Sequence, residues 1–389
     1  MKNEQKNLSY IVFGGSFLAS LVGIFLIMQM EGCYPFGEKT LFAMDMQDQY
    51  LEFFTSLRYV LKGNSSIFFS WSRSMGGNFF GVFAYYLANP LSFVTTFFAI
   101  EDMPLAVAVL TALKIALCGL TFSIYANYFF RSGGKSQILI IPISVSYALM
   151  SYNITYMMCL MWLDGVIFLP LILLGIEKIL AGGKGIFYCL SYIGLLFCNY
   201  YTGYMVGIFA GLYIFYRVFS LLTCKNIQKY VKKMVRFIIC TLLAIGCSAP
   251  ILLPVIIDLC NGRLVENTLL PFAKIYNYDS YNTLFTQFKC GAYKSLDGDG
   301  MPAIYCGIVA FFLSKCFFST KDINKREKLG AFLAVLFFAI SFYFAPLDLV
   351  WHGFQHPVSF PYRYSFLFGF IILYMTTRMV SSVSGEVLK

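Results

Sequence analysis

The sequence predicts an all-α polytopic protein built from membrane-spanning helices. It is 59% hydrophobic and 12% charged, whereas soluble domains average about 45–50% and about 25%. A soluble fold of 389 residues cannot bury that much apolar surface, but a bilayer removes the need to do so. Because hydrocarbon offers backbone groups no hydrogen-bond partner, long apolar segments form helices there. We therefore expect a single transmembrane domain, 1–389, with about ten spans.

The apolar segments define the expected spans. The first is too long for the core of a signal peptide and no small-residue cleavage site follows it, so we expect it to remain as an anchor. A polar break near Asn199 divides another long segment into two short helices. The expected spans are 8–30, 104–130, 137–151, 164–181, two helices within 186–219, 235–257, 302–318, 329–347 and 360–380.

Basic residues set the expected orientation, because Lys and Arg collect in cytoplasmic loops. Lys2 and Lys6 place the N-terminus inside. The later basic clusters all fall inside only if the chain crosses once between 78 and 131. These clusters are Arg131/Lys135, Lys178/Lys184, Lys225/Lys229/Lys232/Lys233 and Lys321/Lys325/Arg326/Lys328. We therefore interpret 79–100 as an interfacial or re-entrant hairpin. The N-terminus and the C-terminus of the protein are then both expected inside. The net charge of +10 has the same origin, so we expect membrane lipids and no nucleic acid as partners.

The first external loop, 31–103, carries the densest chemical signal, and 258–301 forms a second large external loop. An expected helix follows Asp45 and has one apolar and one charged face, a pattern typical of a helix lying in the membrane interface. The apolar face holds Tyr50, Phe54, Leu57 and Leu61, and the other face Asp48, Glu52 and Lys62. A carboxylate at the position of Asp45 can act as a general base. The alternative for Asp45 and Asp48 is capping of the helix.

Aromatic residues near the outer ends of spans are further candidates. Trp71, Tyr85 and Tyr86 belong either to an interfacial aromatic belt or to a platform on which a sugar stacks. Asp164 follows Trp162 at the outer end of a span. It either caps the helix, where a carboxylate complements the helix dipole, or faces the same cavity as Asp45.

Two basic residues are candidates for binding a phosphate. Lys114 lies within a span, where a charge needs a partner or a role, so it snorkels, pairs with a buried carboxylate or binds a lipid phosphate. Arg363 stands at the outer end of the last span, as an interfacial anchor or as a clamp that gives a phosphate two hydrogen bonds. His352 and His356 lack a nearby carboxylate cluster, so we predict no metal site.

Several stretches along nearly the whole chain together resemble the YfhO family of bacterial membrane proteins. They are Asp45-Met-Gln-Asp-Gln-Tyr50, Trp71 with Gly76-Gly77-Asn78-Phe79, Ala84-Tyr-Tyr-Leu with Pro90, Met161-Trp-Leu-Asp164 with Leu169-Pro170-Leu, Asn199-Tyr-Tyr-Thr-Gly-Tyr204, Gly300-Met-Pro-Ala-Ile-Tyr305 and Phe360-Pro-Tyr-Arg-Tyr-Ser-Phe366. The resemblance implies a GT-C type glycosyltransferase, which takes a sugar from a polyprenyl-phosphate carrier at the outer face of the membrane. It also implies lipoteichoic or wall teichoic acid of Gram-positive bacteria as the acceptor.

The resemblance implies roles for individual residues. In GT-C enzymes an acidic residue of the first external loop is usually catalytic; Asp45 matches it best, and Asp48 is the alternate. We expect Arg363, with Lys114, to stabilise the departing polyprenyl phosphate. The residues expected to line the cavity and bind the sugar are Gln49, Tyr50, Trp71, Tyr85, Tyr86, Trp162, Asp164 and Tyr362. Direct attack by an acceptor hydroxyl inverts the anomeric configuration, and a divalent cation bridging Asp45 and the phosphate is an open alternative.

Two other functions fit the same residues. A transporter or flippase for lipid-linked sugar needs the same cavity and cations but no general base, and a non-catalytic partner in cell-envelope assembly needs no chemistry at all. Members of the family are usually longer, with more spans and an extracytoplasmic domain. We therefore expect this chain, which ends at Lys389, to be a fragment, a truncated gene or a minimal version. The expected location is a bacterial cell membrane, with the active side extracytoplasmic.

Overall fold

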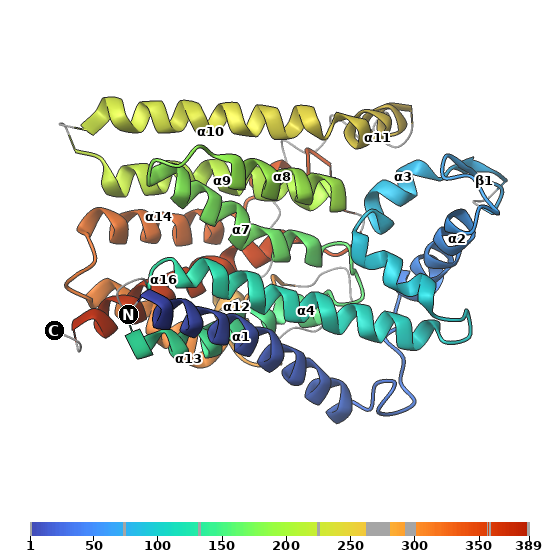
Figure 1. The fold of residues 1–389 in the computed structure, drawn as a ribbon, viewed down its shortest axis with the longest axis horizontal. Helices are drawn as coiled ribbons and strands as arrows, with labels where there is room; N and C mark the ends of the chain where they lie inside the picture. The colour runs from blue at the N-terminus through green and yellow to red at the C-terminus, as the bar shows by residue number, and fades with distance from the viewer. Residues whose placement is uncertain are drawn as a thin grey trace.

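The computed structural model is a bundle of helices that run side by side along the longest axis of the molecule (Figure 1). It describes residues 2–72, 75–130, 134–223, 226–261, 281–291, 301–355, 357 and 359–386. The bundle helices are α1 (Lys2–Met30), α4 (Met103–Asn127), α5 (Ile140–Ala148), α7 (Leu163–Leu180), α8 (Ile186–Cys198), α9 (Tyr200–Leu221), α10 (Ile227–Cys247), α11 (Ala249–Asn261), α13 (Ile308–Ser319), α14 (Lys325–Ser341), α15 (Ala345–Trp351) and α16 (Ser365–Glu386). Shorter elements are η4 (Gly134–Leu139), a 3-10 helix, and the helices α6 (Ser151–Thr155) and α12 (Tyr281–Thr286).

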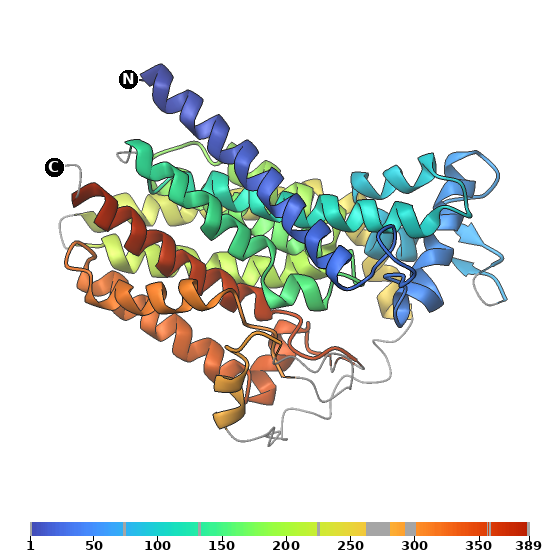
Figure 2. The same ribbon diagram turned by 90° about the horizontal axis from the view of Figure 1, so that it is seen from below.

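Helix α4 lies at the centre of one side of the bundle. It packs against α1, α5 and α7, and α7 packs in turn against α8 and α9. On the other side, α16 packs against α13 and α14, and α14 packs against α9. The apolar window of α4 is accordingly 72% buried, but that of α1 only 28%. The N-terminal end of α1 and the C-terminal end of α16 lie at the same end of the bundle (Figures 1 and 2).

The described residues contain four helices that are long and apolar enough to cross a membrane. They are Asn7–Met30 within α1, α4, α9, and Ser365–Val383 within α16. The total rises to six if each of two bent helix pairs counts as one span. Helices α5, α8 and α13 are shorter than a full span, and α7 contains three charged residues. The protein is therefore a multi-pass, all-α membrane protein, but the expected count of about ten spans is not confirmed.

Two of the expected spans bend sharply. The expected span 235–257 is divided at Ser248 between α10 and α11, whose axes differ by 71°. Helix α14 ends at Ser341, and α15 follows it at 102°. A proline, Pro250 or Pro346, is the second residue of each following helix, and it lacks the N–H that would continue the preceding helix. A further expected span is shortened, because α13 begins only after Gly307, whose φ is +99°.

The loop 31–103, which we expect to be external, folds into short elements at one end of the bundle (Figure 1). They are the π-helix η1 (Met46–Tyr50), α2 (Leu51–Leu61), the antiparallel pair β1 (Phe69–Ser70) and β2 (Gly77–Asn78), α3 (Phe80–Val82), the π-helix η2 (Phe83–Leu87) and the 3-10 helix η3 (Pro90–Phe97). Residues 79–100 thus form no single long helix, as the break at Asn89-Pro90 predicts. The apolar face predicted for α2 is buried at Tyr50, Phe54 and Leu57, and it packs against η2 and η3. Leu61 departs from the prediction, being 52% exposed.

The basic ends of several helices meet at the opposite end of the bundle. Lys233 of α10 donates to the carbonyl of Leu180, and Arg236 donates to the carbonyl of Gly183 at 2.7 Å, just beyond α7. Arg326 of α14 donates to the carbonyl of Leu222, just beyond α9. Cations are stabilised near the C-terminal carbonyls of helices. These contacts bring basic segments of different helices together at one end of the bundle.

The topology can be tested by labelling single cysteines in a cysteine-free variant. Asn64 lies in the first external loop, and Lys184 lies between α7 and α8 at the basic end. We expect a membrane-impermeant maleimide to label Asn64→Cys on intact cells and Lys184→Cys only after permeabilisation. Labelling of both positions from the same side would contradict the expected topology, in which the chain crosses the membrane three times between them, in 104–130, 137–151 and 164–181.

Candidate functional site

Asp45 stands at the start of η1 with its side chain partly exposed. The hydroxyl of Tyr50 and the amide of Gln49 donate to its two oxygens, each at the long distance of 3.4 Å. The side chain makes no capping hydrogen bond, so the capping alternative is not supported for Asp45. The preceding Met44 has φ of 48°, a left-handed conformation that costs a non-glycine residue energy and is concentrated at functional sites. Asp45 is therefore an accessible, weakly held carboxylate on a constrained backbone.

Arg363 lies just before α16 and is held by three acceptors. Its Nη2 donates to the carbonyl of Ser359 at 2.7 Å, and its Nε donates to the carbonyl of Phe360 at 3.1 Å. Its Nη1 donates to the hydroxyl of Tyr201 at 3.2 Å, and the guanidinium lies over the ring of Trp162, 4.8 Å from the centroid. A guanidinium carries five N–H groups and is always charged, so three bonds do not exhaust its capacity to donate. The position of the cation is thereby fixed.

Aromatic residues connect the carboxylate with the guanidinium. On η2, the ring of Tyr86 lies 5.0 Å from that of Tyr50 and 4.6 Å from that of Tyr85. The indole N–H of Trp162 donates to the hydroxyl of Tyr85 at 3.2 Å. Direct contacts therefore run in the order Asp45, Tyr50, Tyr86, Tyr85, Trp162, Arg363. We call these six residues the aromatic site.

Asp45 and Arg363 both influence the pKa of the Cys159 thiol. The hydroxyl of Tyr50 lies 3.9 Å from the Cys159 sulfur. Burial raises the pKa of the thiol to about 12, against the opposing effects of the Tyr50 hydrogen bond and Arg363, and Asp45 adds to the rise. Because only the thiolate is a strong nucleophile, Cys159 is inert at neutral pH. Burial also raises the pKa of Tyr86, and Tyr85 and Asp45 add to that rise.

Lys114 and Asp164 form a buried ion pair beside the aromatic site. The Lys114 nitrogen lies 2.6 Å from Asp164 Oδ1 and also donates to the carbonyl of Leu160 at 2.9 Å. Both side chains are almost completely buried. This corrects the expectation that Lys114 binds a donor phosphate, because its ammonium is enclosed and already paired with a carboxylate. Asp164 is the second residue of α7, whose N-cap position is Trp162, and its Oδ1 accepts from Lys114 and Asn89, so it serves as the partner of Lys114 instead of a helix cap.

Other predicted residues lie outside the aromatic site. Trp71 is 78% exposed and packs on Phe69 in the small hairpin. Tyr362 is buried against Phe342 and has φ of 59°, so the backbone is also left-handed directly before Arg363. Asp48 and Gln49 are exposed on η1.

Some residues of the site were not predicted from the sequence. The amide of Asn199 donates to the carbonyl of Tyr85 at 2.9 Å, while its oxygen accepts from Thr202 N–H and caps α9. The hydroxyl oxygen of Tyr201, two positions further along, accepts a hydrogen bond from Arg363. The polar break at Asn199 was the signal for both, since it interrupts an apolar segment. The sequence around Cys159 did not predict its contact with the Tyr50 hydroxyl.

The described part of the chain offers little for a metal. His352 Nδ1 lies 3.5 Å from Asp348 Oδ1, and His356 lies outside the described residues. Within those residues, no group of three or more His, Cys, Asp or Glu side chains is placed to hold a metal ion.

Comparison with known proteins adds one match. A family model described as "Bacterial membrane protein YfhO" matches residues 16–386. The match includes Asp45 and Arg363, and thus the whole aromatic site. No curated protein and no solved structure matches the chain.

The structural role of the Lys114–Asp164 pair can be tested by removing one partner. We expect Lys114→Met to leave a buried carboxylate without its cation and to destabilise the protein by about 3–5 kcal/mol. The double variant Lys114→Met/Asp164→Leu removes the orphaned charge and should recover much of the loss. Thermal unfolding in detergent measures both changes. An unchanged unfolding temperature in Lys114→Met would show that the pair does not support the fold.

Proposed function

The chain belongs to the YfhO family of bacterial membrane proteins, and we propose that it is a glycosyltransferase that moves a sugar from a polyprenyl-phosphate carrier to an extracytoplasmic acceptor. The observation that supports this most is the aromatic site, in which an accessible carboxylate and a fixed guanidinium act on the same groups. Sugar transfer needs both, a base for the acceptor hydroxyl and a cation for the departing phosphate. The GT-C type fold is part of the same proposal.

Asp45 is the general base in the proposed reaction. The acceptor oxygen attacks the anomeric carbon as its proton passes to the Asp45 carboxylate. The bond from the anomeric carbon to the phosphate oxygen breaks, and its electron pair leaves with the polyprenyl phosphate. Because the displacement is direct, the anomeric configuration inverts. The long contacts from Gln49 and Tyr50 leave the carboxylate able to accept a proton.

Arg363 stabilises the leaving phosphate in this reaction. A guanidinium matches phosphate oxygens with parallel hydrogen bonds and keeps its charge at every relevant pH. The carbonyls of Ser359 and Phe360 hold it in one orientation before the donor arrives, so charge develops opposite a preorganised cation. Lys114 has no part in this step, since it is paired with Asp164.

The half-buried rings of Tyr85 and Tyr86 are the proposed surface for the sugar, since they lie between the base and the cation. Trp162 is only 2% exposed, so it supports Arg363 and Tyr85 from behind. The acceptor is proposed to be an extracytoplasmic glycopolymer such as lipoteichoic or wall teichoic acid. The choice of acceptor rests on the family resemblance.

The role of Asp45 is tested by Asp45→Asn, which keeps the shape of the side chain but removes the proton acceptor. We expect turnover of a polyprenyl-phosphate sugar in nanodiscs to fall by about 10²–10⁴-fold, with donor binding little changed. Asp48→Asn is the matched control, because Asp48 is exposed on η1 three residues away, and it should retain most activity. Near-normal turnover in Asp45→Asn with loss in Asp48→Asn would move the base to Asp48.

The role of Arg363 is tested by Arg363→Lys, which keeps the charge but loses the bidentate fork. We expect donor affinity to fall about tenfold or more, measured by binding of the polyprenyl-phosphate sugar to protein in nanodiscs. Arg58→Lys is the control, because Arg58 is also held by backbone carbonyls, those of Thr96 and Phe98, but is not part of the aromatic site. Unchanged affinity in Arg363→Lys and Arg363→Ala would reduce Arg363 to an interfacial anchor.

A further inference from the structure

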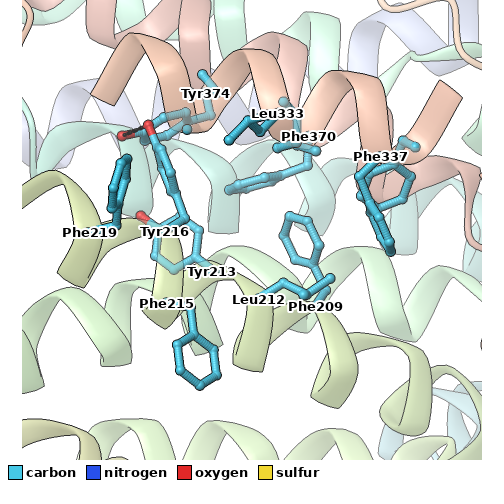
Figure 3. A pocket seen from close by; sticks show the side chains of 15 residues that line it. Phe209, Leu212, Tyr213, Phe215, Tyr216, Phe219, Leu333, Phe337, Phe370 and Tyr374 are labelled. Atoms are coloured by element: carbon cyan, nitrogen blue, oxygen red, sulfur yellow. Dashed lines mark hydrogen bonds between the residues drawn. The ribbon is translucent and has the colours of Figure 1, made fainter. Parts of the chain in front are cut away.

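A cavity of about 340 Å³ lies between α9, α14 and α16, away from the aromatic site. Its lining is aromatic and aliphatic. In Figure 3, the rings of Phe209 and Tyr216 project from α9 toward Leu333 of α14 and Phe370 of α16. Helices α9 and α16 are both long and apolar enough to cross a membrane, so the surroundings of the cavity are hydrocarbon.

The polar atoms of the lining are turned into the protein. The Tyr213 hydroxyl donates to Glu177 at 2.7 Å, and the Tyr374 hydroxyl donates to Glu327 at 2.8 Å. The Tyr216 hydroxyl in turn donates to that of Tyr374 at 3.3 Å. The aromatic rings of these tyrosines, and not their hydroxyl groups, therefore line the cavity. A buried water needs two to four polar partners, which a lining of this kind does not supply.

Two of the helices that line the cavity approach each other closely at one point. Helices α9 and α14 approach so closely that a Cβ on Gly330 would lie 2.5 Å from the ring of Tyr216. Because the cavity is open to the surrounding hydrocarbon, an acyl chain is the occupant available to it.

Basic residues near one end of the cavity indicate the headgroup to which the hydrocarbon chain is attached. Gly330 lies four residues, about 6 Å along the axis, beyond Arg326 at the basic end of α14. Arg326 donates to the carbonyl of Leu222, three residues beyond the lining residue Phe219. Arg326 and Lys325 are both exposed. Basic segments at a membrane surface attract anionic lipids.

We propose that this cavity binds one acyl chain of an anionic phospholipid, whose phosphate lies against Arg326. The site is separate from the proposed glycosyltransferase site, because Arg363 and Asp45 lie at the other end of the bundle. Its ligand belongs to the leaflet at the basic end and anchors the α9–α14 contact.

Photolabelling tests this proposal without any variant. Protein in nanodiscs is illuminated with phosphatidylglycerol that carries a diazirine in one acyl chain, and adducts are mapped by mass spectrometry. We expect adducts on the lining residues of α9 and α14. Adducts spread over the lipid-facing surface of the bundle, with none on the lining, would overturn the proposal.

A matched pair of variants on α14 sharpens the test. Ala334 lines the cavity, and Ala339 on the same helix is comparably exposed but does not. We expect Ala334→Phe to fill the space and lower labelling of the lining at least fivefold, and Ala339→Phe to leave it unchanged, with thermal unfolding confirming that both fold. Equal labelling in the two variants would contradict the proposal.

Two competing lipids test the identity of the occupant. We expect Arg326→Ala to lower labelling by phosphatidylglycerol, and a diazirine phosphatidylcholine to label the lining of the parent protein less. Equal labelling by phosphatidylcholine would contradict the assignment of an anionic lipid. Displacement of the phosphatidylglycerol probe by unlabelled polyprenyl phosphate would also overturn it, by showing that the cavity holds the carrier chain.

Discussion

The ion pair between Lys114 and Asp164 is the contact on which the geometry of the aromatic site depends. A charge inside a membrane bundle is costly unless it is paired, so these two side chains fix α4 against α7. The amide of Asn89 donates to the same Asp164 oxygen at 2.5 Å, while its own oxygen caps η3. One carboxylate thereby ties the first external loop to two bundle helices. Trp162 lies two residues before Asp164, and this sets its contact with Tyr85.

A second set of buried charges fixes the helices at the basic end of the bundle. Arg217 of α9 makes a bidentate pair with Glu177 of α7, at 2.5 and 3.2 Å. Arg378 of α16 pairs in the same way with Glu327 of α14, at 2.7 and 3.1 Å. Arg217 also lies 3.7 Å from Glu327, which joins the two pairs. Since α16 is held in register by this network, Arg363 at its other end is presented to the aromatic site from a fixed helix.

Much of the fold could be predicted from the sequence where the signal is local. The amphipathic pattern predicted the buried face of α2, and the polar break at Asn199 predicted the boundary between α8 and α9. Contacts between distant segments could not be predicted in this way. Hydropathy identifies Lys114 as a costly charge but cannot name its partner, which is 50 residues away. Arg363 was predicted from its place at the outer end of a span and Asp45 from the family resemblance, whereas the contacts of the tyrosines that connect them arise only from packing.

We propose that the aromatic site breaks the bond between a sugar and a polyprenyl phosphate. The most direct measurement is mass spectrometry of the products formed by the purified parent protein in nanodiscs, supplied with a lipid-linked sugar and a glycopolymer acceptor. The account predicts free polyprenyl phosphate and an acceptor heavier by one sugar, both absent when the acceptor is omitted. Intact donor together with unmodified acceptor would contradict the account.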